Sequence, residues 1–235
     1  MNILKNKIAF MMTIENIHGR EILTQLVNTK FFPSCIIIEH KSERSERIRN
    51  LKYNNYEPKK FTEIIKNSST DIFYVENHND VVTEKILKKF QPELIILGGT
   101  RILKENIIKI PRFGIINSHP AILPKYQGSD CVAWSILNGD LVGATVHFID
   151  SGVDSGPIIL QKSLDYHDCK TLGEIRVKVM KLCSNLVLES LNGLKNNTLV
   201  AKKQNSSLSI HHKPISVDKL KIVEKIILDK FNEKT

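Results

Sequence analysis

The chain has 235 residues and a formal net charge of +9, with 41% hydrophobic and 25% charged residues. These proportions are ordinary for a soluble globular protein, and the length fits one main domain with a small addition. No apolar stretch approaches the roughly 20 residues that a membrane-spanning helix needs. The first residues carry Lys5 and Lys7 among apolar side chains and indicate a strand rather than a signal peptide. We therefore expect a cytoplasmic protein without a membrane partner.

The positive charge is spread along the chain rather than gathered in one stripe. Its densest run, 41–60, also contains Glu43, Glu46 and Glu57, and few aromatic residues stand between the basic ones. Base stacking on aromatic side chains is typical of single-strand binding, so this pattern favours an anionic small substrate over a nucleic acid. The four cysteines lack a C-x-x-C spacing, which indicates buried thiols rather than a zinc or redox site; they are Cys35, Cys131, Cys169 and Cys183.

The first half of the chain alternates strand patterns with helix patterns. Short β-branched or apolar runs predict strands, and apolar residues three and four apart predict helices. The continuous apolar run Leu94–Leu97 is typical of a central strand that is buried on both faces. This alternation predicts an α/β fold with a Rossmann-like, mostly parallel sheet flanked by helices. The predicted elements are strand 7–12, a polar turn 13–20, helix 21–27, strand 35–38, helical segments 42–51 and 61–65, strand 71–75, helix 79–90, strand 94–97, a helical or irregular link 102–110 and strand 114–117.

The second half has a different character. The predicted strands 145–149 and 157–163 are separated by seven residues, which favours an antiparallel hairpin within the core. Around them the pattern predicts helix 129–137, a long helix 171–194, a short strand 198–201 and a last helix 217–231. We therefore divide the chain into a main domain, 1–195, and a small C-terminal strand and helix appendage, 196–235.

Polar side chains follow two of the predicted strands. Asn117 and His119 come directly after a buried-looking strand, and Asp154 follows the next strand along the chain. Open α/β sheets bind ligands at the carboxyl ends of their strands. There is no G-x-S-x-G elbow, so a covalent acyl-enzyme is not indicated. An amide, an imidazole and a carboxylate instead suit direct acyl transfer, although each residue taken alone is as well explained by a loop or a turn cap.

Three sequence blocks, taken in order, are more specific than any single residue. They are N-x-H-P at 117–120, L-P-K-Y-x-G at 123–128, and G-x-T-V-H-F-x-D-x-G-x-D-x-G-P-I-I at 143–159. Together they resemble the formyltransferase family that uses 10-formyltetrahydrofolate as co-substrate. The resemblance implies that Asn117 and His119 hold the developing oxyanion, while Asp154 sets the charge state of His119 and helps to remove the amine proton. It implies no metal, and His147 is expected to support the site rather than to react.

The same resemblance implies two walls for the folate. On one side, the segment after the strand at 94–97 would receive the pterin ring through Arg101, Ile102 and Leu103. On the other side, backbone groups around Asp150, Gly152 and Val153 would close the site, because a glycine lets the main chain come close to the ring. For Ile102 and Leu103 a role in the core is equally compatible with the sequence.

Three branches of the family differ in the amine that accepts the formyl group, and the sequence is compared with each of them. The turn after the first strand has one glycine, which is a poor phosphate cradle for glycinamide ribonucleotide, and the segment after Asn196 is short for the RNA-binding domain expected of a methionyl-tRNA formyltransferase. The chain therefore most resembles the sugar N-formyltransferases, with nucleotide-linked 4-amino-4,6-dideoxyhexose acceptors such as dTDP-4-amino-4,6-dideoxyglucose for O-antigen and lipopolysaccharide synthesis. The other two acceptors, and a non-catalytic ligand-binding protein of the same fold, stay open. Expected substrate contacts are Glu15, Lys125, Tyr126 and Trp134.

An apolar stripe on the last predicted helix suggests a homodimer. Ile222, Val223, Ile226 and Ile227 recur at helical spacing, and the sequence offers them few obvious local partners. We therefore expect this helix to contact a second copy of the chain.

Overall fold

The computed structural model describes residues 7–14, 16–40, 53–54 and 56–233. Its main sheet has seven strands in the order β3-β2-β1-β4-β5-β7-β8. Neighbouring strands from β3 to β5 are parallel, whereas β7 is antiparallel to both β5 and β8. The prediction of a Rossmann-like, mostly parallel sheet with an antiparallel hairpin is therefore confirmed. The strands are β1 (Ile8–Thr13), β2 (Cys35–Glu39), β3 (Asp71–Val75), β4 (Leu94–Leu97), β5 (Ile115–His119), β7 (Gly143–Phe148) and β8 (Ile158–Ser163).

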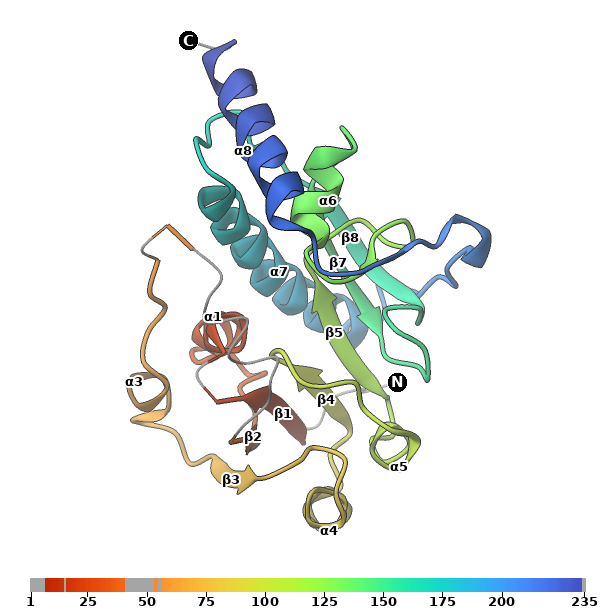
Figure 1. The fold of residues 1–235 in the computed structure, drawn as a ribbon. Helices are drawn as coiled ribbons and strands as arrows, with labels where there is room; N and C mark the ends of the chain where they lie inside the picture. Colours follow the sequence, from red (N-terminus) through yellow and green to blue (C-terminus); the bar gives the residue numbers. More distant parts are fainter. Residues whose placement is uncertain (1–6, 15, 41–52, 55, 234–235) are drawn as a thin grey trace.

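Helices cover both faces of this sheet (Figure 1). Because successive side chains of a strand point to opposite faces, Phe10 packs in the core under α1 and α7, and Met11 packs in the core under α4 and α5. Both side chains are fully buried. The sheet is thus a rigid layer between two apolar cores. The helices are α1 (Ile17–Leu26), α3 (Phe61–Ile65), α4 (Val81–Phe90), α5 (Glu105–Ile108), α6 (Cys131–Leu137), α7 (Leu172–Lys195) and α8 (Val217–Asn232).

Side-chain caps fix where several helices begin. Asn16 accepts a hydrogen bond from the Gly19 N–H (3.0 Å), so α1 begins at Ile17 and the predicted polar turn 13–20 is too long. Asp80 caps α4 in the same way through the Thr83 N–H (2.8 Å). The predicted helix 42–51 lies outside the described residues, as does most of the charged run 41–60.

The C-terminal segment differs most from the prediction. The strand predicted at 198–201 is wrong, because only Lys202 forms an isolated bridge, to Ile158. Instead, β9 (His211–His212) pairs in parallel with β6 (Gln127–Gly128), after a 3-10 turn, η1 (Ser206–Leu208). The boundary drawn at residue 195 coincides with the end of α7.

Helix α8 lies against α6 and α7 of its own chain. Val223 and Ile227 are buried there, whereas Ile222 is 51% exposed. The reasoning for a dimer is corrected on this point, because Val223, Ile226 and Ile227 all pack against the core of their own chain. The homodimer itself stays a prediction.

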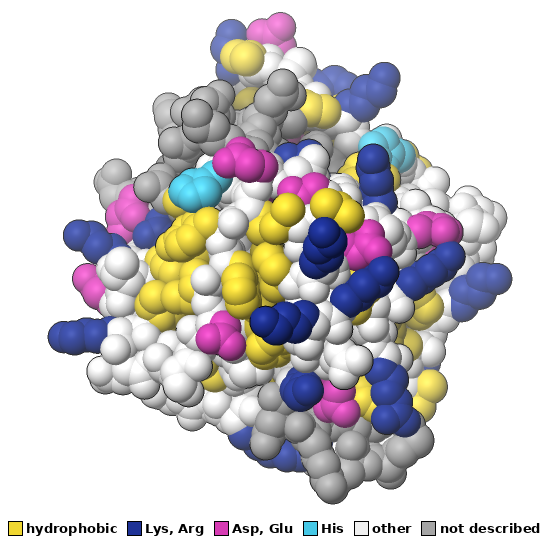
Figure 2. Space-filling view, turned by 90° about the horizontal axis from the view of Figure 1, so that it is seen from below, with side chains coloured by type: hydrophobic (Ala, Val, Ile, Leu, Met, Phe, Trp, Pro, Cys, Tyr) yellow, Lys and Arg dark blue, Asp and Glu magenta, His cyan; other side chains and the backbone are white. Residues whose placement is uncertain are grey.

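The face formed by α4, α5 and the edge strand β3 carries exposed apolar side chains. Tyr74, Val81, Val82 and Ile102 are each more than half exposed. Figure 2 shows hydrophobic side chains gathered near the middle of the molecule as seen from that side, with Lys and Arg around them. Among the described residues, no helix has the length and apolarity needed to cross a membrane.

Candidate active site

A cavity of about 470 Å³ opens where β1, β4 and β5 end. This is the carboxyl edge of the parallel strands, where open α/β sheets bind their ligands. The nine residues predicted for catalysis and for the folate all line it: Asn117, His119, Asp154, Arg101, Ile102, Leu103, Asp150, Gly152 and Val153.

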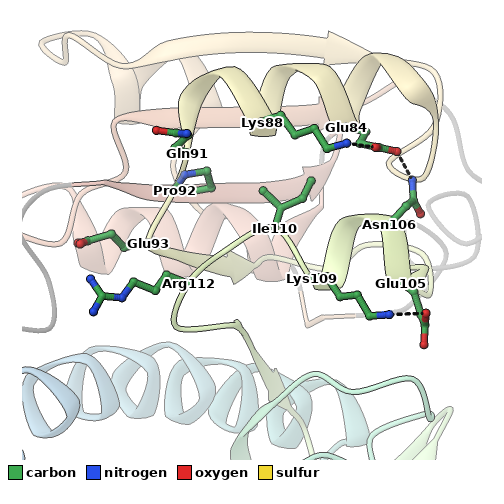
Figure 3. Close-up of a pocket in the computed structure, with 10 residues that line it drawn as sticks. All are labelled: Glu84, Lys88, Gln91, Pro92, Glu93, Glu105, Asn106, Lys109, Ile110 and Arg112. Atoms are coloured by element: carbon green, nitrogen blue, oxygen red, sulfur yellow. Dashed lines mark hydrogen bonds and ion pairs between the residues drawn. The ribbon is translucent and has the colours of Figure 1, made fainter.

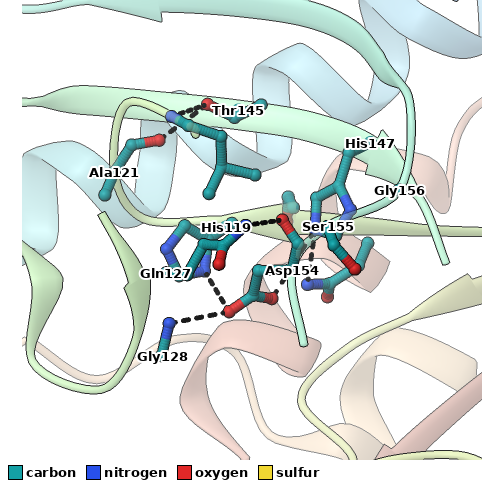
Figure 4. A network of polar contacts seen from close by, with 12 residues as sticks. His119, Ala121, Gln127, Gly128, Thr145, His147, Asp154, Ser155 and Gly156 are labelled. Atoms are coloured by element: carbon teal, nitrogen blue, oxygen red, sulfur yellow. Dashed lines mark hydrogen bonds and ion pairs between the residues drawn. The ribbon is translucent and has the colours of Figure 1, made fainter. Parts of the chain in front are cut away.

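Asn117, His119 and Asp154 come together at the cavity through two different elements. The first two stand at the end of β5, and Asp154 stands in the loop between β7 and β8. Figure 4 shows His119 beside Asp154. His119 Nδ1 lies 3.4 Å from Asp154 Oδ2, and both side chains are largely buried. The antiparallel pairing of β7 with β5 is therefore what brings the carboxylate to the imidazole.

The orientation of the His119 ring is fixed by a backbone carbonyl. Its Nε2 lies 2.6 Å from the Tyr126 carbonyl oxygen, which only accepts hydrogen bonds, so Nε2 carries a proton. The other ring nitrogen, Nδ1, then faces Asp154. The ring of His119 is thus held between the Tyr126 carbonyl and the Asp154 carboxylate.

His147 lies behind this pair and is fully buried. Burial lowers the pKa of His147 to about 4, even though the nearby Asp154 acts in the opposite direction. Its Nδ1 donates to the Phe148 carbonyl (2.8 Å), so the neutral ring presents Nε2 as an acceptor to Asn117 Nδ2 (3.4 Å). One amide hydrogen of Asn117 is thereby held in place, and the second is left for a ligand in the cavity.

One side of the cavity is apolar. We call its side chains the apolar wall; they are Leu97, Ile102, Leu103, Ile149 and Val153. Gly99 lies beside Leu97 with a φ of +82°, and a Cβ there would be 2.3 Å from Asn16 Nδ2. A larger residue at Gly99 would therefore displace the turn that leads into this wall.

A buried ion pair fastens the apolar wall to the sheet. Arg101 makes two hydrogen bonds to Glu39, from Nε to Oε2 (2.7 Å) and from Nη2 to Oε1 (2.6 Å). Glu39 is fully buried at the end of β2 and also accepts from the His78 N–H (2.8 Å). The guanidinium of Arg101 is therefore engaged by the protein, and its role in the cavity is to position residues 101–103.

The opposite side is polar, and most of it was not predicted from the sequence. We call it the polar wall; its residues are Asn16, His18, Ser118, Ser129 and Asp130. His18 Nε2 lies 2.8 Å from Ser118 Oγ, which links α1 to β5 beside Asn117 and His119. His211 from β9 also lines the cavity. Two local sequence features marked parts of this wall, the polar turn after the first strand and the N-x-H-P block that contains Ser118. Asp130 and His211 were not predicted, because they come from segments far apart in the chain.

Three predicted substrate contacts lie outside the residues that line the cavity, and their role in binding the substrate stays a prediction. Tyr126 is buried with its hydroxyl bonded to Asp140, and burial raises the pKa of Tyr126 to about 12. Lys125 Nζ pairs with the same carboxylate at 2.6 Å. Trp134 Nε1 donates to the Lys213 carbonyl (2.9 Å). The fourth predicted contact, Glu15, lies outside the described residues.

A second hollow, of about 710 Å³, lies between α4 and α5 (Figure 3). Its charged side chains pair with one another, Lys88 with Glu84 at 2.6 Å and Lys109 with Glu105 at 2.8 Å. It brings together none of the residues predicted for chemistry. Within the described part of the chain, no group of three His, Cys, Asp or Glu side chains is placed to hold a metal ion.

The formyl transferase family model matches residues 6–191, which is most of the chain. The chain belongs to the formyl transferase family. Among curated proteins it is 34% identical to the methionyl-tRNA formyltransferase of Clostridium tetani over 129 residues, which is 54% of this chain and 42% of that protein. The matching enzyme of Thermodesulfovibrio yellowstonii is 32% identical over 127 residues, 53% of this chain and 41% of that protein. The aligned part is thus less than half the length of these relatives.

Solved structures of several formyltransferases share the fold. The N-formyltransferase of Helicobacter canadensis, solved with folinic acid and dTDP-3-aminofucose, aligns with a TM-score of 0.64 and 20% identity over 98% of this chain and 82% of that one. Glycinamide ribonucleotide transformylase 1 of Symbiobacterium toebii aligns with a TM-score of 0.65 and 17% identity, over 86% and 96%. At these identities the likeness establishes the fold and leaves the acceptor open.

Proposed function

We propose that this protein is a formyltransferase that moves the formyl group of 10-formyltetrahydrofolate to the amine of a nucleotide-linked amino sugar. The observation that carries the proposal is the position of Asn117, His119 and Asp154, which line one cavity together with the apolar wall and the polar wall. A formyl carbonyl and an amine that entered from these two sides would meet beside the three residues.

The apolar wall fits the ring system of a folate. Its aliphatic side chains come from two segments, the one that follows β4 and the one that follows β7, so they would flank a flat ring. Backbone groups of the second segment are ordered by Asp150, which accepts from the Gly152 N–H (3.0 Å) and the Ser155 hydroxyl (2.7 Å). Folate binding needs such a slot with a few fixed polar groups at its edge.

The three polar residues have separate tasks in the proposed reaction. When bound, 10-formyltetrahydrofolate supplies a formyl group carried on N10. His147 binds one amide hydrogen of Asn117, and the other amide hydrogen stabilises the negative charge that develops on the carbonyl oxygen. The positive charge of a protonated His119 stabilises the same oxygen. The amine nitrogen bonds to the formyl carbon, and the bond from that carbon to N10 breaks. Asp154 accepts the proton that the amine loses and passes it to N10 of the departing tetrahydrofolate.

The polar wall supports an acceptor with several hydroxyl groups. It offers a hydroxyl, an imidazole and a carboxylate, in Ser118, His18 and Asp130, beside the catalytic residues. A hexose matches such a surface, because each of its hydroxyls both donates and accepts hydrogen bonds. The positive charge of the chain, +9, would draw in an anionic nucleotide.

Methionyl-tRNA is the second candidate acceptor. It is supported by the curated relatives, which are methionyl-tRNA formyltransferases at 32% to 34% identity over about half of this chain. Exposed lysines on and near α8 would favour a polyanion; they include Lys213, Lys219, Lys221 and Lys225.

The two candidates are separated by comparing kcat/KM for three acceptors at one salt concentration. We expect N-formyl product from dTDP-4-amino-4,6-dideoxyglucose, and much less from methionyl-tRNA or glycinamide ribonucleotide. Preference for methionyl-tRNA would overturn the sugar assignment and keep formyl transfer. Binding of folinic acid without transfer to any of the three would instead support a ligand-binding protein of this fold.

A further inference from the structure

The backbone of Asp154 is held in an uncommon conformation. Its φ is +53°, in the left-handed region that residues other than glycine seldom adopt. Such a conformation persists only when the surrounding structure fixes it. The groups that fix Asp154 therefore decide where its carboxylate stands relative to His119.

The side-chain amide of Gln204, in the C-terminal segment, binds two carbonyl groups of the turn that contains Asp154. Gln204 Nε2 donates to the Asp154 carbonyl (2.8 Å) and to the Gly156 carbonyl (2.7 Å). Both partners only accept, so the amide nitrogen, and not Oε1, must face them. Gln204 is 9% exposed, and its Oε1 has no hydrogen-bond partner among the described residues. The two donor contacts thus hold the side chain although its acceptor is left unsatisfied.

The same C-terminal segment also places the donor to the Asp154 carboxylate. Asp154 Oδ2 accepts from the Gly128 N–H at 3.0 Å. Gly128 belongs to β6, which β9 holds through the bonds from Gln127 N to Ile210 O (3.0 Å) and from Ser129 N to His212 O (2.9 Å). Figure 4 shows Asp154 between Gly128 and the Ser155–Gly156 backbone. Residues 204–212 therefore fix both ends of Asp154, its carbonyl and its carboxylate.

We propose that Gln204 is a positioning residue that sets the distance between Asp154 and His119, on the premise that the proposed formyl transfer is correct. Gln204 lies beyond residue 191, where the match to the family model ends. A segment outside the matched part thus completes the site. Gln127 is a weaker second support, because its Nε2 reaches the same Asp154 carbonyl at 3.3 Å.

The test replaces Gln204 by Met, which removes the N–H donors of the amide and keeps the approximate size of the side chain. In Gln204→Met we expect kcat to fall about 10- to 100-fold, since a small misplacement of a catalytic group has effects of this order. KM for 10-formyltetrahydrofolate and for the amine should change little, because neither wall is altered. Gln127→Met should lower kcat by less. Lys203→Ala, at the exposed neighbouring position, is the matched control and should behave as the wild type.

Hydrogen exchange gives a readout that does not depend on activity. The Gly128 N–H should exchange about tenfold faster or more in Gln204→Met, because the carboxylate that accepts it is released. An unchanged Gly128 exchange rate, or a wild-type kcat, in a folded Gln204→Met would overturn the inference. A loss of melting temperature and folinic acid affinity in step with kcat would also overturn it, since it would reveal a general structural role. If the wild type transfers no formyl group, the proposed function fails, and the exchange rate alone decides the role of Gln204.

Discussion

The two walls of the cavity are built in different ways. The apolar wall comes from two short continuous segments, 97–103 and 149–153, each of which directly follows a strand. The polar wall is assembled from α1, the end of β5 and the start of α6, and the C-terminal β9 adds His211 to the cavity. A wall made of continuous segments has a local sequence signature, whereas an assembled wall depends on the packing of distant segments. This contrast suggests that co-substrate and acceptor recognition can be changed separately.

The walls are also supported by different forces. A buried ion pair, Glu39 with Arg101, ties the apolar wall to β2. The His18–Ser118 contact, by comparison, is a single side-chain hydrogen bond between two residues of the polar wall. Removing one support should therefore leave the other wall intact.

The largest loss of activity is expected for a substitution of His119, which lines the same cavity as both walls. His119→Ala removes the imidazole that we place beside the formyl carbonyl, and we expect kcat to fall about 10²- to 10⁴-fold, the usual range for a general acid or base. Folinic acid affinity, measured by calorimetry, should stay near that of the wild type because both walls remain. A kcat within severalfold of the wild type would remove His119 from the catalytic set.

The stability of the protein should fall at low pH, because the buried His147 resists protonation in the folded state. The folded pKa of His147, about 4, lies below the ordinary histidine value of 6.5, so the unfolded chain binds the proton more tightly. Its stabilising contribution is present above pH 6.5 and is lost as the pH falls toward 4, by up to about 3 kcal/mol. Urea unfolding at pH 7 and pH 5 should show a smaller loss in His147→Gln than in the wild type. The exposed His167→Gln is the control, and equal losses in both variants would contradict the assignment.

A substitution that loosens the apolar wall should weaken the binding of folate and leave the binding of the acceptor unchanged. Glu39→Gln removes the charge that holds Arg101, and we expect the Kd for folinic acid to rise about tenfold, or about 1.4 kcal/mol. KM for the acceptor should not change, because neither Glu39 nor Arg101 belongs to the polar wall. Glu57→Gln removes a carboxylate that is 78% exposed and serves as the control. A parallel rise in both constants would show that the walls are not independent.

The smallest expected effect is the change in KM for the acceptor after a substitution in the polar wall. His18→Leu removes the partner of Ser118 and one ligand-facing imidazole, and we expect KM for the acceptor to rise about fivefold, which corresponds to one ordinary hydrogen bond. The affinity for folinic acid should be unaffected. His167→Leu, outside the cavity, tests whether loss of any histidine has this result. An unchanged acceptor KM would place the amine elsewhere in the cavity.

The contrast between the walls also explains what the sequence predicted. The sheet and its hairpin follow from local patterns, because strand runs are continuous in the chain. The nine cavity residues were predicted from the family resemblance of the motif blocks and of the segment after Leu97. Lys125 and Tyr126 lie inside a motif block, yet their side chains turn away to Asp140, and no local pattern encodes that direction. Gln204 and His211 were missed because their place depends on the pairing of β9 with β6, two segments about 80 residues apart. The strand predicted at 198–201 failed for a related reason, since an apolar run alone does not supply a pairing partner.

The most direct test is single-turnover formyl transfer from 10-formyltetrahydrofolate to dTDP-4-amino-4,6-dideoxyglucose, in the wild type and in Asp154→Asn. We predict that the wild type forms the N-formyl sugar, and that Asp154→Asn is slower by about 10²- to 10⁴-fold while it binds folinic acid as tightly as the wild type. A near-normal rate in Asp154→Asn would contradict the role of the carboxylate. Absence of N-formyl product from the wild type, with this sugar and with the other two acceptors, would contradict formyl transfer itself.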